Sequence, residues 1–203
     1  MFDAPDIDVV DFLIMQGLSI HDVDNRGSNM IMTAKSNHHM IKDLIKRGLN
    51  INHVNDFKKN ALFNSSLKKL EVLLECNINI HQLSKMEENC AFYNSYQFCF
   101  DEEKLVKKLK LMKEAGVDLT IEDKRGKNIF ERVKSHGEIE FLLKEGVNRP
   151  DYNLKSYLSS ADIQKIKMIE EIQMKITIDK ERETILGSLE NVSIDNELKK
   201  RRI

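Results

Sequence analysis

Apolar residues recur along most of the chain in short helical runs, each followed by a small residue and then by alternating apolar and polar positions. The clearest examples are VVDFLIMQGLSIHDVD (9–24) and MIKDLIKRGLNINHVN (40–55). Apolar residues three or four apart, such as Ile41, Leu44 and Ile45, form one stripe along a helix. Because a single helix pair cannot bury such a stripe alone, the pattern predicts helix pairs stacked one upon the next.

The small residue after each run marks an internal repeat. The five landmarks are Gly17, Gly48, Asn77, Gly116 and Gly146. They are separated by 31, 29, 39 and 30 residues. Gly and Asn adopt the left-handed conformation that commonly ends a helix, so we expect a helix to end just before each landmark. The first run, 9–15, would then be a lone helix that caps the N-terminal end of the array.

An asparagine stands twelve residues after each of the first four landmarks. These residues are Asn29, Asn60, Asn89 and Asn128. Asparagine is a strong N-cap, so each is expected to open the next helix. Between landmark and cap, DNRG (24–27) and DKRG (123–126) have the Asp-first, Gly-last order of a tight turn. Each repeat should therefore contain two helices and one protruding turn.

Two segments, GLSIHDVDNRGSNMI (17–31) and GVDLTIEDKRGKNIF (116–130), resemble the ankyrin-repeat family. The repeat of this family consists of a helix, a loop, a second helix, a glycine and then an Asp-x-x-Gly finger. The resemblance covers about residues 6–149. The family's Thr-Pro-Leu-His opening is absent, with Asn at the Thr position, and Lys58 and Glu87 replace the finger glycine in the middle repeats. The resemblance implies an all-α solenoid of stacked helix pairs with short hairpin fingers, numbering four to five repeats within residues 1–149.

The 39-residue interval contains an aromatic insertion near residues 92–104. Its start, CAFYNSYQFCF (90–100), places five aromatic residues within nine positions, and the whole chain has only 9 Phe, 4 Tyr and no Trp. Tyrosine and phenylalanine contribute large contact area at low entropic cost, so one interpretation is an exposed binding patch. The alternative is that these rings pack onto the flank of the array.

The repeats stop at Pro150, and residues 150–203 are expected to form a C-terminal helical extension. After a linker at 151–160, isoleucines three and four residues apart predict an amphipathic helix, which ITIDKERET (176–184) would interrupt. Three roles remain open for this helix: a cap on the last repeat, a homodimer contact, or docking into a partner. The final LKKRRI (198–203) forms a basic tail.

Composition restricts the classes of partner and the compartment. The formal net charge is −1 and the pI is about 6.6, so no strong overall field would attract nucleic acid or an anionic membrane. The acidic N-terminus lacks the layout of a signal peptide, and no apolar stretch approaches the roughly 18 residues of a membrane span. Three cysteines without a CxxC motif favour reduced thiols. We therefore expect a soluble cytoplasmic protein, in a host cell if its source is a virus or pathogen.

The usual motifs of catalysis and metal binding are missing from the sequence. It contains no HExxH motif, no zinc-like cysteine spacing and no glycine-rich phosphate loop. Three histidines, His21, His53 and His81, fall four or five residues after successive landmarks, as structural residues of a repeat would. We expect no enzymatic activity, no cofactor, no metal and no small-molecule substrate.

The function that these patterns favour is a non-catalytic protein–protein interaction module that inhibits or sequesters a protein target, such as a host or defence enzyme. One alternative is a nucleic-acid binder that uses the Lys-rich KKLKLMK (107–113) and the basic tail. Another is a homo-oligomeric scaffold held by the C-terminal helix. The residues expected to contact a protein partner are Asn25, Arg26, Phe57, Lys58, Met86, Glu87, Tyr93, Tyr96, Phe98, Lys124 and Arg125.

Overall fold

The computed structural model describes residues 6–34, 39–94, 101–149 and 160–200, and in the last helix it describes side chains as far as residue 188. Regular structure in these ranges is entirely helical. The all-α class expected from the sequence is therefore confirmed for the described part of the chain. None of the helices in it is long and apolar enough to cross a membrane.

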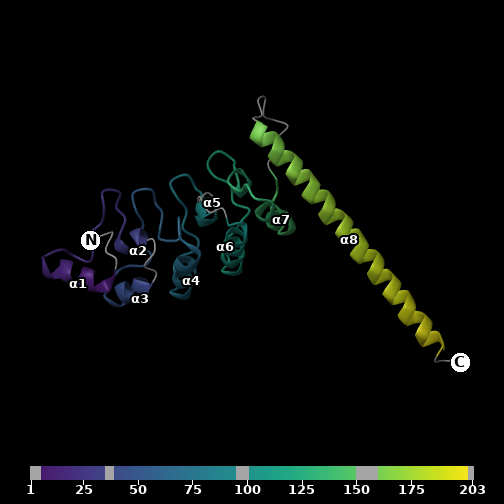
Figure 1. The fold of residues 1–203 in the computed structure, drawn as a ribbon, viewed down its shortest axis with the longest axis horizontal. Helices are drawn as coiled ribbons and strands as arrows, with labels where there is room; N and C mark the ends of the chain where they lie inside the picture. The colour runs from purple at the N-terminus through teal and green to yellow at the C-terminus, as the bar shows by residue number, and fades with distance from the viewer. Residues whose placement is uncertain (1–5, 35–38, 95–100, 150–159, 201–203) are drawn as a thin grey trace.

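Five helices stand side by side in one row, with protruding turns along the opposite edge (Figure 1). They are α1 (Ile7–Met15), α3 (His39–Lys46), α4 (Leu67–Glu75), α6 (Glu102–Glu114) and α7 (His136–Lys144). Shorter inner elements precede α3, α6 and α7. These are α2 (Met30–Thr33), α5 (Cys90–Asn94) and the 3-10 helix η1 (Ile129–Glu131). Contacts between elements join neighbours in the row, with α4 packing on α3 and α6, and α6 on α7.

Each helix of the row ends two residues before its landmark, as the pattern predicts. All five landmarks have positive φ, from 57° at Asn77 to 97° at Gly116. The residue after each landmark donates its N–H to a carbonyl five positions earlier, as from Leu49 to Leu44 at 3.0 Å. These bonds satisfy carbonyls that a helix end otherwise leaves open. The landmark residues are therefore helix C-caps.

The four marker asparagines do more than cap helices. Asn29, Asn89 and Asn128 open α2, α5 and η1, and each accepts a backbone N–H through Oδ1. The expectation of a helix is wrong at Asn60, which opens the turn 61–64 while still accepting from Leu62. Each side-chain amide also donates to a carbonyl in the next loop along the row. The acceptors, in chain order, are Asn50, Asn79, Asp118 and Asn148 at 2.5–3.1 Å.

Apolar side chains fill the space between successive helix pairs as one continuous core. The most deeply buried members include Ile31, Ile41, Leu44, Leu70, Leu73, Leu109, Met112, Phe130, Ile139 and Leu142. At the N-terminal end, α1 stands without an inner helix among the described residues and leaves Phe12 and Met15 exposed. The expected lone first helix is thus present.

The last helix, α8 (Ser160–Lys200), runs without a break through 176–184, so the expected interruption is wrong. The β-branched residues there lower helix propensity only slightly, and the segment contains no Pro or Gly. The Thr177 and Thr184 hydroxyls also donate to carbonyls four residues earlier within the helix. The expected linker falls on residues 151–159, outside the described residues, and on Ser160, which begins the helix.

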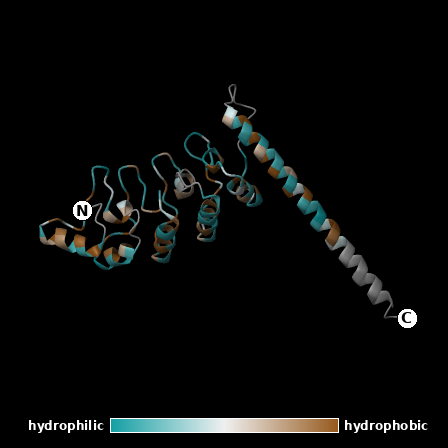
Figure 2. Cartoon of the chain, in the orientation of Figure 1, coloured by the Kyte–Doolittle hydropathy of each residue, from teal (hydrophilic) through white to brown (hydrophobic). Residues whose placement is uncertain are grey.

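The first half of α8 packs on α7, whereas the second half extends past the row (Figure 1). Ile169 and Ile172 are fully buried in this contact, and Lys165 donates its ammonium to the Phe130 carbonyl. Beyond this contact, apolar residues recur among the residues of α8 that are coloured in Figure 2. Exposed Ile178 and Ile185 are examples. The helix therefore covers the last pair of the row and continues beyond it.

Candidate binding surface

Four protruding turns, 24–28, 55–59, 84–88 and 123–127, share one backbone design. In each, the first residue donates its N–H to the carbonyl of the fifth at 2.7–3.0 Å. The side-chain oxygen of the first residue accepts the N–H groups of the third and fifth residues at 2.8–3.3 Å. Asp, Asn and Ser all have the short polar side chain that this turn requires. The four turns are therefore built alike although their sequences differ.

The pKa values of the two turn aspartates reflect this bonding. Burial alone would raise the pKa of Asp24 and Asp123. Bonds from Ser28 and Arg26 to Asp24, and from Arg125 and Lys127 to Asp123, outweigh burial and hold both pKa values below the usual range. The carboxylates thus stay ionised and bound to their own turns.

Consecutive turns are joined to one another by backbone hydrogen bonds. Asp56 donates to the Arg26 carbonyl at 3.0 Å, Lys85 to that of Phe57 at 2.9 Å, and Lys124 to that of Met86 at 3.0 Å. The third residues of the four turns therefore follow one another in a continuous line. We call Arg26, Phe57, Met86 and Arg125 the turn row.

The turn-tip residues singled out from the sequence all lie at this edge and are all exposed. They are Asn25, Arg26, Phe57, Lys58, Met86, Glu87, Lys124 and Arg125. Phe57 is 47% exposed and Met86 is 40% exposed. Two large apolar side chains thus stand side by side in solvent on a hydrogen-bonded backbone.

The aromatic insertion is divided between the core and the surface. Phe92 is 2% exposed, so for this ring the packing interpretation is correct. Tyr93 is half-buried and meets Phe63 edge-on, with ring centroids 5.6 Å apart. The insertion also lengthens α6 to 13 residues, against 9 in α4 and α7. Tyr96 and Phe98 lie outside the described residues.

Lys59 connects the turn row to the inner helices. Its ammonium lies 3.4 Å from the centroid of the Tyr93 ring and 5.6 Å from that of Phe57. A cation at this distance is attracted by the face of an aromatic ring. Sequence reasoning missed Lys59, although its position directly before a marker asparagine, at the fifth place of its turn, could have indicated it.

Ion pairs surround the last turn and line a small polar recess beside it. Arg125 bonds the Asp123 carboxylate at 2.8 and 3.0 Å, and Arg132 bonds the buried Glu88 at 2.9 Å. The recess has a volume of about 130 Å³. Its lining residues are Phe92, Asp123, Arg125, Lys127, Glu131 and Arg132. Because cations and carboxylates already neutralise one another there, it is a poor ligand pocket.

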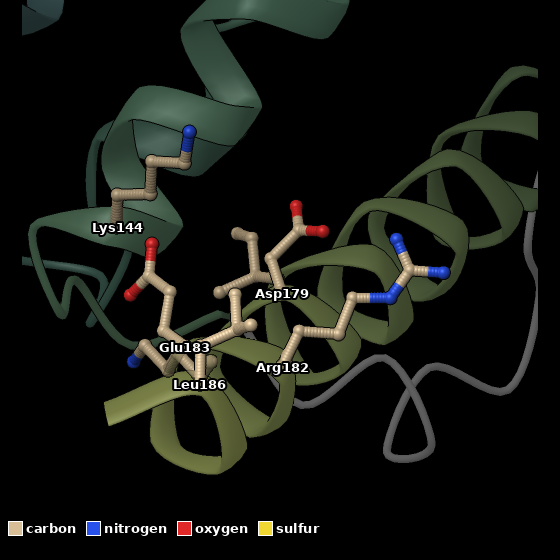
Figure 3. A pocket seen from close by; sticks show the side chains of 7 residues that line it. Lys144, Asp179, Arg182, Glu183 and Leu186 are labelled. Atoms are coloured by element: carbon tan, nitrogen blue, oxygen red, sulfur yellow. The ribbon is translucent and has the colours of Figure 1, made fainter. Parts of the chain in front are cut away.

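A larger hollow of about 420 Å³ opens where α8 leaves α7 (Figure 3). Lys144 approaches it from α7, and Asp179, Arg182 and Glu183 approach it from α8. The hydrogen bond that the Lys144 ammonium donates to the Glu140 carboxylate raises the pKa of Lys144. Charges of both signs alternate along an open wedge, which does not favour one class of small molecule.

The remaining candidates for chemistry have structural positions. His53 places Nε2 2.6 Å from the Gly27 carbonyl, whereas His21 and His81 are exposed. Burial raises the pKa of the Cys90 thiol to about 12, so it is not a reactive thiolate. No group of three or more His, Cys, Asp or Glu side chains in the described ranges could hold a metal ion.

Comparisons with known proteins do not assign the chain to a family. No protein-family model matches the chain, and no curated protein matches its sequence significantly.

Proposed function

We propose that the chain is an ankyrin-type solenoid that acts as a non-catalytic protein-binding module. Support for this class comes from the repeating order of inner element, longer helix, left-handed Gly or Asn, and hydrogen-bonded turn. Packing of each helix pair on its neighbours alone is typical of repeat proteins. The last repeat would be capped by the first half of α8.

The observation that carries the binding function is the exposure of Phe57 and Met86 in the turn row. Large apolar residues on a surface commonly mark a contact site, and aromatic residues often dominate binding energy. The backbone beneath them is fixed by bonds within and between turns, so little ordering is required on binding. A rigid edge of this kind can cover a partner's surface, and inhibition or sequestration by occlusion is the mode of action we propose.

Affinity capture from cells, followed by quantitative mass spectrometry, tests this proposal with three forms of the full chain. Wild type is compared with Phe57→Ala/Met86→Ala and with Phe12→Ala/Met15→Ala. The second pair removes the same two residue types from exposed positions on α1. We expect a partner that wild type and the α1 variant retain and that the turn-row variant loses by at least about tenfold, with unchanged melting temperature.

Two outcomes would contradict the proposal. In one, all three forms capture the same proteins in equal amounts. In the other, the α1 variant loses the partner as completely as the turn-row variant does.

A further inference from the structure

The turn row has a symmetrical chemical order, with an arginine at each end and two apolar residues between them. Arg26 and Arg125 flank Phe57 and Met86, and all four are exposed. Backbone bonds of 2.9–3.0 Å connect each turn with the next, so this order is fixed in space. A ligand that lies along the row would meet cation, apolar, apolar and cation in turn.

The spacing of the row favours one ligand conformation. Adjacent packed helices lie roughly 8–10 Å apart, and the turns follow the same interval because each turn belongs to one repeat. A polyproline II chain rises about 3.1 Å per residue and has three residues per turn, so every third side chain faces the same way at about 9 Å intervals. In a β-strand, residues three apart point to opposite faces. Three residues of a polyproline II segment therefore span about the interval between one turn and the next.

The charges around the row favour a ligand with acidic groups at its two ends. The exposed cations of the four turns are Arg26, Lys58, Lys85, Lys124 and Arg125. The carboxylates of Glu88 and Asp123 are buried, at 3% and 1% exposure. The exposed acids, Asp56 and Glu87, adjoin the two apolar residues at the centre. Lys58 and Lys85 adjoin the same two apolar residues, so the centre of the row is balanced in charge. A segment with acids only at its ends places them beside Arg26 and Arg125, whereas a uniform polyanion such as a nucleic acid would also meet Asp56 and Glu87.

We propose that the turn row binds a polyproline II protein segment of the pattern acidic-x-x-apolar-x-x-apolar-x-x-acidic. This inference rests on the proposed protein-binding function and adds the chemistry of the partner. The acidic residues pair with Arg26 and Arg125, and the two apolar residues contact Phe57 and Met86. Arg26 can bind a carboxylate through two donors, whereas Arg125 already donates Nε and Nη2 to Asp123 and offers its Nη1 N–H groups.

A fluorescein-labelled ten-residue peptide tests the inference by fluorescence polarisation with the full chain. The probe has Glu at positions 1 and 10, Leu at positions 4 and 7, and Pro or Ala elsewhere. One control peptide replaces both Glu by Lys, and another moves the Leu residues to positions 5 and 6. A ten-nucleotide single-stranded DNA is the nucleic-acid control.

We expect the probe to bind at least about tenfold more tightly than either control peptide or the DNA. Arg26→Glu/Arg125→Glu should weaken binding of the probe by at least about tenfold. Arg149→Glu/Arg182→Glu, which reverses two exposed arginines away from the turns, should leave it unchanged.

The inference is overturned if the probe does not bind in titrations into the millimolar range, or if the control with shifted Leu residues binds equally well. Tighter binding of the DNA, lost in Arg26→Glu/Arg125→Glu, would instead assign the row to nucleic acid. If capture of cell proteins depends on Phe57 and Met86 while the probe does not bind, only the acidic polyproline II inference fails. If no capture depends on these residues, the proposed function itself fails.

Discussion

Two residues of the middle turns occupy a backbone conformation that favours glycine. Lys58 and Glu87 have φ of 56° and 64°, close to the 71° and 67° of Gly27 and Gly126 at the same place in the outer turns. A side chain in this region clashes with its own backbone at a cost of about 1 kcal/mol or more. The turn design is therefore retained against local strain at both positions.

Replacement of either residue by glycine should stabilise the protein. We expect Lys58→Gly and Glu87→Gly each to raise the free energy of unfolding by about 0.5–1 kcal/mol, because relief of strain exceeds the added entropy of the unfolded chain. Chemical denaturation measures the change. Asn77→Gly, also at positive φ, is the matched control and should gain less, since Asn tolerates this region. A loss of stability in both turn variants would contradict the argument.

Lys69 is an ionisable residue in the core, only 2% exposed. Its ammonium donates to the Met32 carbonyl at 2.9 Å and so connects α4 to α2. Burial lowers its pKa from 10.5 to about 8. Between these pH values the unfolded chain binds the additional proton, so the contribution of Lys69 to stability increases as pH rises through this window and is least favourable below pH 8.

Substitution of Lys69 by Met should remove this pH dependence. Wild type should gain up to roughly 3 kcal/mol relative to Lys69→Met between pH 7 and pH 10, because the buried ammonium becomes neutral. Denaturation at both pH values measures the difference. Lys68→Met, at the exposed neighbouring position, should follow wild type. If the free energy of unfolding depends on pH equally in wild type and Lys69→Met, burial does not destabilise the Lys69 ammonium by this amount.

At the scale of elements, the marker asparagines act as clamps between repeats as well as caps. Asn60 is 1% exposed, and its side chain accepts from the Leu62 N–H at 3.1 Å and donates to the Asn79 carbonyl at 2.7 Å. The same double bonding occurs at the other three markers. Each marker therefore joins one repeat to the loop of the next.

Asn60→Asp separates these two roles. A helix or turn cap alone would accept Asp as readily as Asn. A clamp would lose its donor and place a carboxylate against the Asn79 carbonyl, so we expect Asn60→Asp to cost at least about 1–3 kcal/mol and Asn60→Ala a similar amount. Thermal denaturation checks both variants. The exposed Asn25→Asp is the control, and equal stability of Asn60→Asp and wild type would leave only the capping role.

Local sequence signals predicted the helix ends and turns but not the contacts between repeats. Gly48 and Asn29 were informative because each has a conformational or capping preference that acts within a few residues. The bond from Asn60 to Asn79 and the burial of Lys69 depend on packing against another repeat. A helix was expected after Asn60, but Asn64 in that segment has φ of 67°, which a helix excludes. Of the candidate surface, exposure at the tips was predictable, whereas the bonds that align them were not.

At the scale of the whole molecule, α8 differs in burial along its length. One side of α8 is buried on α7 through Ile169 and Ile172, whereas Ile178 and Ile185 farther along the helix are exposed. Covering the last helix pair requires only the first half. The cap and self-association roles considered from the sequence therefore involve different residues of one helix.

Alanine substitutions distinguish these roles. Ile169→Ala and Ile172→Ala should each lower the free energy of unfolding by about 2–5 kcal/mol, because they leave cavities against α7. Ile178→Ala/Ile185→Ala is the control and should change stability little. Light scattering should give the mass of a monomer for wild type and for this control. A dimeric wild type that the control variant converts to monomer would assign the exposed residues Ile178 and Ile185 of α8 to self-association.

The backbone bonds between successive turns have a consequence for how recognition could diversify. Each turn contributes one side chain to the row and is aligned through its neighbours alone. Duplication or loss of one helix pair would therefore lengthen or shorten the row by one position while leaving the remaining order intact. Single substitutions at positions such as Phe57 or Met86 would likewise change one contact without redesign of the others. Under the proposed binding function, specificity can evolve one repeat at a time.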